Sequence, residues 1–209
     1  MEDLDFDKAL IASAFKIAAA QGWSRVSVYA AATAANLPLD RARARFPMRA
    51  AILLRLGSIV DQAVLAVPAE DPTPRGRVFD VVMRRFDALL PYRDGLKALL
   101  RALPANPATA LMLAAATRSS MGWMLEAAGI PVAGCLGHLK RDGLIAIWTY
   151  ATREFVKDAS PDLSATMAAL DRALDRACRI AEMCEPRSRG PASPPPNKPD
   201  VSPAPSVVD

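Results

Sequence analysis

The chain of 209 residues has little of what most enzymes and metal-binding proteins need. It contains a single histidine, His138, and three cysteines whose spacing does not match that of a metal site. The sequence shows no Ser-His-Asp set, no zinc pattern and no glycine-rich phosphate loop. We therefore expect neither an enzyme nor a protein that holds a metal or another cofactor.

Long apolar runs are also missing. No run reaches the roughly 18 residues of a membrane-spanning helix, and the first residues, Met1–Asp7, are acidic where a signal peptide would be basic. An odd number of cysteines without a disulfide framework suits a reducing compartment. These features predict a cytoplasmic protein without stable membrane insertion.

Patterns typical of β-strands are scarce, whereas apolar residues at helical spacing are common. Hydrophobic residues make up 52% of the chain, and alanine and leucine dominate. This composition favours an all-α fold. The periodicity and the Gly and Pro breaks predict helices over residues 4–21, 28–35, 39–46, 48–67, 77–90, 92–103, 106–128, 135–157 and 161–184.

Two proline-rich stretches divide the chain. The polar segment 68–76, PAEDPTPRG, reads as a linker between a unit of residues 1–67 and a larger unit of residues 75–184. Residues 185–209 contain eight prolines and few bulky apolar residues. Such a segment cannot bury enough apolar surface to offset its chain entropy, so we expect a disordered tail.

Residues 24–56 predict a helix-turn-helix. Ser27 is a good N-cap for the first short helix, and Asn36 can take the left-handed conformation in the turn. Pro38 pre-sets the backbone for the second helix, and Pro47 ends that helix at Phe46. Two short helices joined by a tight turn are the geometry of this motif.

The second of these helices lies in a locally basic segment. Between residues 25 and 55 there are six arginines and one acidic residue, Asp40. We expect Leu39, Ala42 and Phe46 on the packing side, with Asp40, Arg41 and Arg43 facing outward. Arginine at such positions can bridge phosphates or bind a guanine edge bidentately. The other interpretation, a merely solvated helix face, stays open at this point.

The order of Ala14-Phe15, Gly22-Trp23, Val26-Ser27-Val28, Ala35-Asn36-Leu37 and Phe46-Pro47 resembles the N-terminal domain of TetR-family repressors. The resemblance implies a TetR-like fold, with a three-helix helix-turn-helix domain followed by a C-terminal helical bundle. It also implies a homodimer, formed through the last two helices, whose small domain binds a double-stranded DNA operator as a repressor. The larger domain would respond to a small hydrophobic effector.

The resemblance implies a set of DNA-binding residues in the small domain. They are Arg25, Ser27, Tyr29, Leu39, Asp40, Arg41, Arg43, Arg45 and Arg49. The sequence departs from the family at three of the places that matter. Pro38 stands where Ser or Thr often caps the recognition helix, Arg43 where a tyrosine contacts phosphate, and Met48 where a serine caps the next helix.

Soft and aromatic side chains on the later helices are the candidates for an effector pocket. They are Met112, Met121, Trp123, Met124, Trp148 and Phe155. Such side chains can line an apolar cavity between helices, or they can simply form the core. The sequence does not decide between these two interpretations.

A second resemblance gives an alternative function. Residues 141–177, with Ser160-Pro161-Asp162 followed by Thr166, Leu170 and Arg172, are similar to a lipid-binding family of ubiquinone biosynthesis. That family shares the TetR fold without acting as a repressor. The alternative is therefore a lipid- or isoprenoid-binding accessory protein in ubiquinone biosynthesis that has lost DNA recognition.

Overall fold

The computed structural model describes residues 1–184, and these residues form helices joined by short turns. The predicted disordered tail, 185–209, lies outside the described residues. In chain order the helices are α1 (Asp3–Gln21), the short 3-10 helix η1 (Trp23–Arg25), α2 (Val28–Ala34), α3 (Leu39–Arg45), α4 (Arg49–Leu65), α5 (Pro74–Leu89), η2 (Leu90–Tyr92), α6 (Arg93–Ala102), η3 (Leu103–Ala105), α7 (Pro107–Ala127), α8 (Gly134–Phe155) and α9 (Ser164–Cys184). The prediction of an all-α fold is confirmed.

The turn between α2 and α3 forms as the sequence predicts. The Ser27 side chain accepts a hydrogen bond from the Ala30 N–H at 3.0 Å and so caps the start of α2. Asn36 closes α2 with a φ of 52°, in the left-handed region. Leu37 is buried beneath the turn, and Pro38 precedes the first residue of α3. Local sequence alone therefore specifies this turn.

Two helices, α5 and α9, start at residues other than those predicted, and in both a side chain accepts a hydrogen bond from an N–H group of the first turn. The linker 68–76 is shorter than predicted, because Thr73 accepts a hydrogen bond from the Gly76 N–H at 3.0 Å and starts α5 at Pro74. The last helix starts later than predicted, at Ser164 instead of residue 161. There the backbone at Leu163 turns with a φ of 56°, so Ser160-Pro161-Asp162 form a turn outside α9.

A buried carboxylate fixes this turn before α9. Asp158 accepts hydrogen bonds from the N–H and the hydroxyl of Thr166, at 2.8 and 2.7 Å. It also accepts hydrogen bonds from the N–H and the hydroxyl of Ser160. The Ser160 hydroxyl oxygen in turn accepts a hydrogen bond from the Ser164 N–H at 3.0 Å. Asp158 is therefore the residue that ties the end of α8 to the first turn of α9.

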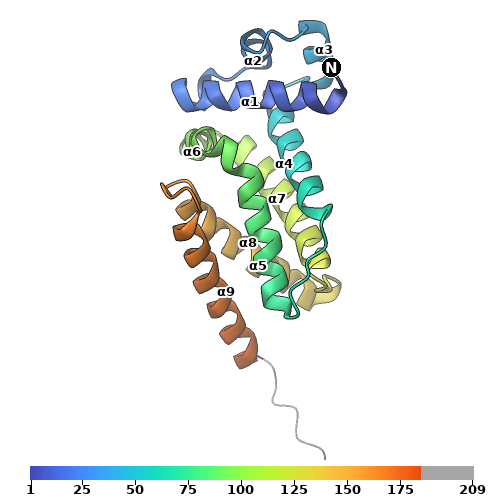
Figure 1. Cartoon of the computed structure of the whole chain (residues 1–209), viewed down its shortest axis with the longest axis vertical. Coiled ribbons are helices and arrows are strands. Elements are labelled where there is room, and N and C mark those ends of the chain that lie inside the picture. Colours follow the sequence, from blue (N-terminus) through green and yellow to red (C-terminus); the bar gives the residue numbers. More distant parts are fainter. Residues whose placement is uncertain (185–209) are drawn as a thin grey trace, which may run out of the picture.

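The helix-turn-helix lies at one end of an elongated molecule (Figure 1). From there α4 runs along α5 and α7, and α8 packs against α9 on the other side. A second connection joins the helix-turn-helix to the larger part of the molecule, because α1 lies across α6. At that crossing Gly95 approaches so closely that a Cβ there would lie 2.5 Å from the Phe15 carbonyl oxygen. The Phe15 ring also meets the Tyr92 ring edge-on, with 5.4 Å between the centroids.

Candidate functional site

The second helix of the helix-turn-helix, α3, presents part of its predicted outer face. Arg43 and Asp40 are exposed, and Ala42 and Phe46 are buried, as expected. Leu39, which we expected on the packing side, is 45% exposed, so this prediction is wrong. It is the first residue of α3, and the apolar position beneath the turn is already filled by Leu37. Leu39 is therefore available at the surface.

Two acidic residues of α1 bind arginines of the basic segment. The Asp7 carboxylate, 1% exposed, accepts hydrogen bonds from Arg45 at 2.6 and 2.7 Å and from Arg55 at 2.6 Å. Asp3 pairs with Arg41 at 2.6 Å and with Arg45 at 2.8 Å. These pairs connect α1, α3 and α4 and partly neutralise the basic segment, since three of its six arginines are paired with acids.

The electrostatics of Asp7 follow from these contacts. Burial alone would raise the pKa of Asp7, but hydrogen bonds and charge attraction from Arg45 and Arg55 outweigh burial and lower it. Asp7 is therefore ionised at neutral pH and holds both guanidinium groups in place. Sequence reasoning missed Asp3 and Asp7 because they are 38 or more residues away from their partners.

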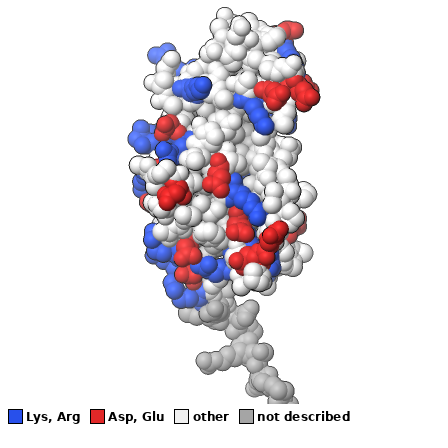
Figure 2. Space-filling model, viewed as in Figure 1, with Lys and Arg blue, Asp and Glu red and all other residues white. Residues whose placement is uncertain are grey.

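The other predicted DNA-binding residues occupy different environments. Arg25 and Tyr29 are exposed, and Ser27 serves as the cap of α2. The Arg49 guanidinium lies 5.8 Å from the centroid of the Trp23 ring and donates a hydrogen bond to the Trp23 carbonyl. Figure 2 shows acidic and basic side chains close together at this end of the molecule, without a continuous basic patch on the face drawn. Arg43 itself donates a hydrogen bond to the Pro47 carbonyl.

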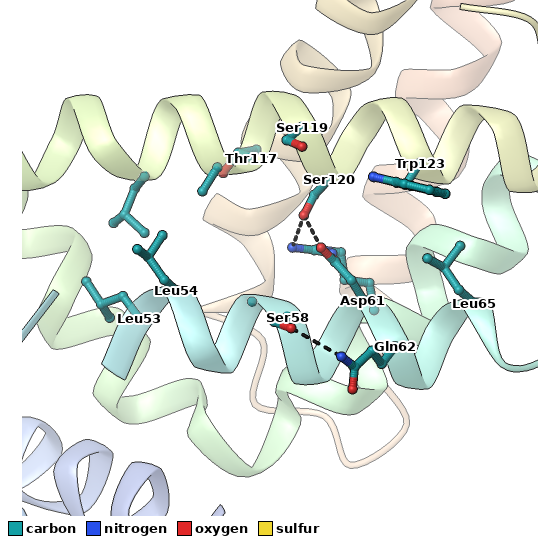
Figure 3. A pocket seen from close by; sticks show the side chains of 14 residues that line it. Leu53, Leu54, Ser58, Asp61, Gln62, Leu65, Thr117, Ser119, Ser120 and Trp123 are labelled. Atoms are coloured by element: carbon teal, nitrogen blue, oxygen red, sulfur yellow. Dashed lines mark hydrogen bonds and ion pairs between the residues drawn. The ribbon is translucent and has the colours of Figure 1, made fainter. Parts of the chain in front are cut away.

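A groove of about 390 Å³ opens between α4 and α7 in the larger part of the molecule. Its walls are mainly apolar, and Figure 3 shows Leu53, Leu54 and Leu65 of α4 facing Trp123 and the α7 hydroxyl groups across it. The Trp123 side chain is 59% exposed there. A volume of this size lies toward the lower end of the range of small-molecule pockets, about 300–1,000 Å³.

A polar cluster forms the floor of this groove. Asp61 of α4 accepts hydrogen bonds from Arg85 of α5 and from the hydroxyl of Ser120 of α7 (Figure 3). Arg85 also donates to the Ser120 oxygen at 3.3 Å. The Arg85 side chain is 8% exposed and the Asp61 side chain 21% exposed. Burial lowers the pKa of Arg85 to about 10, so its guanidinium remains charged at neutral pH.

The six predicted pocket residues separate into two groups. Met121, Met124 and Phe155 are fully buried in the core, and Trp148 stacks on Phe86 with 4.6 Å between the ring centroids. Met112 is half-buried and packs against the core. Trp123 alone of the six lines the groove between α4 and α7. The core interpretation, left open above, therefore describes most of this set.

Sequence reasoning missed the polar floor. Asp61, Arg85 and Ser120 are 24 to 59 residues apart, so no local motif joins them. One signal was present: Arg85 stands at helical spacing among the buried residues Val78, Val81, Val82, Phe86 and Leu89 of α5. A charged residue on an apolar helix face needs a buried partner, and this could have indicated the cluster.

An apolar stripe on α8 has no partner within the described chain. Its members Leu136, Leu139, Gly143, Ala146 and Tyr150 are exposed and follow each other at alternating spacings of three and four residues. This spacing places them on one face of the helix. At the end of α9, Ile180 is exposed as well.

Two further observations concern the described residues only. No group of three or more His, Cys, Asp or Glu residues among residues 1–184 is placed to hold a metal ion. No helix in this range is long and apolar enough to cross a membrane.

Comparison with known proteins identifies the fold. No protein-family model matches the chain, and no curated protein does either. A TetR transcriptional regulator from Nitrosomonas europaea ATCC 19718 is similar in structure, with a TM-score of 0.68 and 20% identity over 84% of this chain and 99% of that chain. A TetR-family transcriptional regulator from Streptomyces coelicolor gives a TM-score of 0.58 and 18% identity, over 91% of this chain and 94% of the other.

A third solved structure agrees with these two. A TetR transcriptional regulator from Rhodococcus sp. RHA1 gives a TM-score of 0.55 and 17% identity, over 84% of this chain and 97% of that chain. The similarity spans nearly the whole length of all three regulators. The chain therefore has the TetR fold, as the sequence predicted. No comparison supports the alternative of a lipid-binding accessory protein.

Proposed function

We propose that this chain, which has the TetR fold, is a dimeric transcriptional regulator that binds operator DNA through α3 and responds to a small effector. Residues 1–67 would form the DNA-binding unit, and residues 75–184 the unit for effector binding and dimerisation. The observation that carries the proposal is the geometry of α3. This helix is fixed by its neighbours on one side and presents exposed Asp40 and Arg43 on the other.

The arginines of the basic segment would divide their roles at the DNA. Arg25 and Arg43 are exposed and can reach phosphates or base edges. Arg45 is held by Asp7, so its main effect is to orient α3 against α1. Arg41 would exchange its pairing with Asp3, whose side chain is 67% exposed, for a contact with DNA. The side chains of Tyr29 and Leu39 are exposed and could add contacts to sugar or base methyl groups.

The apolar stripe on α8 supports the homodimer. A second copy of this chain, related by a two-fold axis, would place the same stripe against its own and cover the exposed leucines Leu136 and Leu139. A dimer would present two α3 helices to two half-sites. Such half-sites are separated by about one turn of DNA, roughly 34–36 Å, so a change in the separation of the α3 helices lowers the affinity for both. Effector binding would act as the switch of a cytoplasmic repressor in this way.

Binding of the purified protein to DNA from upstream of its own gene tests the proposal. We expect a sequence-dependent complex whose affinity falls steeply with salt, because phosphate contacts release counterions. The double variant Arg41→Ala, Arg43→Ala should lose this complex while keeping its helical content and its dimeric state. Binding that survives the double substitution would show that α3 does not read the DNA. The absence of any sequence-dependent complex would contradict the proposed function as a whole.

A further inference from the structure

The groove between α4 and α7 differs from an ordinary surface depression because its floor contains an ion pair whose arginine is buried. We infer that it binds a small, electrically neutral, mainly apolar molecule that carries a hydrogen-bond donor such as a hydroxyl at one end. The donor would bind Asp61, and the apolar part would lie between the leucines of α4 and Trp123. This inference deepens the proposed function, on which the role of the molecule as an effector rests.

The first argument is that packing alone does not require the cluster. Arg85 stands on the buried face of α5, where an apolar side chain would continue the row of Val82, Phe86 and Leu89. Replacing a buried ion pair by apolar residues of similar size is often neutral or stabilising. In addition, the Arg85 Nε is buried without a hydrogen-bond partner. A polar group kept under such conditions needs an explanation other than stability.

The second argument is that the cluster is arranged asymmetrically toward the groove. Arg85 is sealed beneath it, with its side chain 8% exposed, whereas the Asp61 side chain is 21% exposed and lines the groove. A carboxylate has about four acceptor positions, and the described chain fills one on each oxygen, from Arg85 and from Ser120. The spare positions can accept a hydrogen bond from a bound molecule. The groove therefore offers an acceptor at its floor.

The third argument concerns charge. The groove is lined by one acidic and one basic residue, Asp61 and Arg85, and their charges cancel. An anion entering the groove would meet Asp61, the more exposed of the two, before the sealed Arg85. A cation would compete with Arg85 for a carboxylate that is already paired. A neutral molecule avoids both costs, and its hydroxyl still finds the acceptor.

The position of the groove connects its occupant with the DNA-binding end. Its wall on one side is α4, which also carries Arg55, the partner of Asp7. Seven of its lining residues lie along this helix, among them Leu54, Asp61 and Leu65. A molecule held between α4 and α7 therefore contacts the helix that follows directly after α3. This contact is how occupancy of the groove would reach the DNA.

Three molecules with the same alkyl chain and different ends test the inference: 1-octanol, octanoate and octylammonium. Binding to the full chain is measured by calorimetry at pH 7 without DNA. We expect 1-octanol to bind about tenfold or more tightly than either ion, a ratio that corresponds to one favourable hydrogen bond without a charge conflict. Tighter binding of octanoate or octylammonium, or no binding of 1-octanol up to its solubility, would overturn the inference.

Two variants locate the site. A Cβ at Gly57, a lining residue of α4, would meet no atom within 4 Å, so Gly57→Phe can fill the groove without a clash at that point. It should abolish binding of 1-octanol, whereas Ala108→Phe, at an exposed position in the first turn of α7, should leave it unchanged. Unaltered binding to a folded Gly57→Phe variant would place the site elsewhere and overturn the inference.

A paired variant tests the role of the polar floor without leaving a buried charge. Asp61→Leu combined with Arg85→Met removes both members of the ion pair, a change that folded proteins often tolerate. The preference for 1-octanol over octanoate should then fall by about tenfold. An unchanged preference would overturn the assignment of Asp61 as the acceptor. The calorimetry is done without DNA, so the two proposals can fail separately. A chain that binds 1-octanol but no operator DNA would contradict only the proposed regulator. A chain that binds operator DNA but no 1-octanol would contradict only the proposed binding site in the groove.

Discussion

Two aspartates, the buried Asp7 and the half-buried Asp61, each join three helices, but with opposite exposure of the charges. At the helix-turn-helix end the acid is sealed, and its partners Arg45 and Arg55 reach the surface. At the groove the arginine is sealed, and the acid Asp61 faces the open side. An ion cluster can thus hold three helices together whether its acid or its arginine is the buried member. The member that is more exposed determines which kind of group the cluster can bind.

The same difference determines what happens when the acid is removed. Without Asp7 the two arginines can turn toward water, because their side chains are 26% and 34% exposed. Without Asp61 the guanidinium of Arg85 remains buried and unpaired. An uncompensated buried charge costs far more than a rehydrated one. The following predictions test this comparison, from the largest effect to the smallest.

Asp61→Ala should be the most destabilising of these changes. It leaves Arg85 buried with the Ser120 hydroxyl and the Trp148 ring beside it but no carboxylate, and breaking a buried pair in this way costs about 3–5 kcal/mol. Chemical denaturation gives the free energy of unfolding. The matched control is the double variant Asp61→Leu, Arg85→Met, which we expect within about 1 kcal/mol of the original chain. A loss equally large in the double variant would show that packing, not the charge, accounts for the effect.

Asp7→Ala should cost less, about 2–3 kcal/mol, because charge-assisted hydrogen bonds are lost but both arginines regain water. It should also weaken DNA binding, since α3 loses its attachment to α1. Denaturation of Asp7→Ala and Asp61→Ala under identical conditions tests the order directly. If Asp7→Ala proved more destabilising than Asp61→Ala, the cost of removing the acid would not depend on how exposed the remaining arginines are.

Asp158 extends the comparison to a buried carboxylate whose partners are neutral. Burial alone would raise its pKa, but hydrogen bonds from Ser160 and Thr166 outweigh burial and lower the pKa to about 2. A lowered pKa stabilises the fold above the unfolded value of 3.8, and this contribution is lost as the pH falls toward 2. The contribution amounts to about 2 kcal/mol.

The stability of the chain between pH 5 and about 2 measures this contribution. Asp158→Asn should lower stability at neutral pH and flatten the acid-dependent loss, because asparagine does not titrate. An acid profile identical to that of the original chain would show that other carboxylates dominate the loss.

The smallest effect compares two neighbouring arginines of α3. Arg43→Ala should lower DNA affinity by about 1 kcal/mol and reduce the slope of log affinity against log salt by about one, as expected for one phosphate contact. Its free energy of unfolding should stay within about 0.5 kcal/mol of the original. Arg45→Ala should instead lower stability, because Arg45 is bound to Asp7. Loss of stability in Arg43→Ala together with loss of DNA affinity alone in Arg45→Ala would contradict the roles given to these two residues.

Local features of the fold could be predicted from the sequence, whereas contacts between distant helices could not. Ser27, Asn36 and Pro38 specify the turn between α2 and α3, because caps and φ preferences act within a few residues. The start of α9 could not be predicted, because Leu163 takes a φ of 56°, which a leucine rarely adopts. A contact with Asp158, which follows α8, helps to fix this turn.

The sites divide in the same way. Arg43 could be placed on the outer face of α3 from its position between buried Ala42 and Phe46. The pairing of Asp7 with Arg45 and Arg55, and that of Asp61 with Arg85, depends on tertiary packing across 24 or more residues. Periodicity identified the apolar residues of the later helices. It could not separate Trp123, which lines the groove, from Met121 and Met124, which fill the core.

The close approach of Gly95 to Phe15 has a consequence for how the molecule can move. A rigid body held at one point can rotate about three axes, whereas a body held at two separate points rotates only about the line that joins them. The helix-turn-helix end is held at two places, by its continuation into α4 and by the crossing of α1 over α6. We therefore expect this end to move mainly by rotation about the line that joins these two places. Any side chain at position 95 would push the backbones of α1 and α6 apart at that crossing. We expect the helix-turn-helix end to rotate about the other axes as well in such a variant.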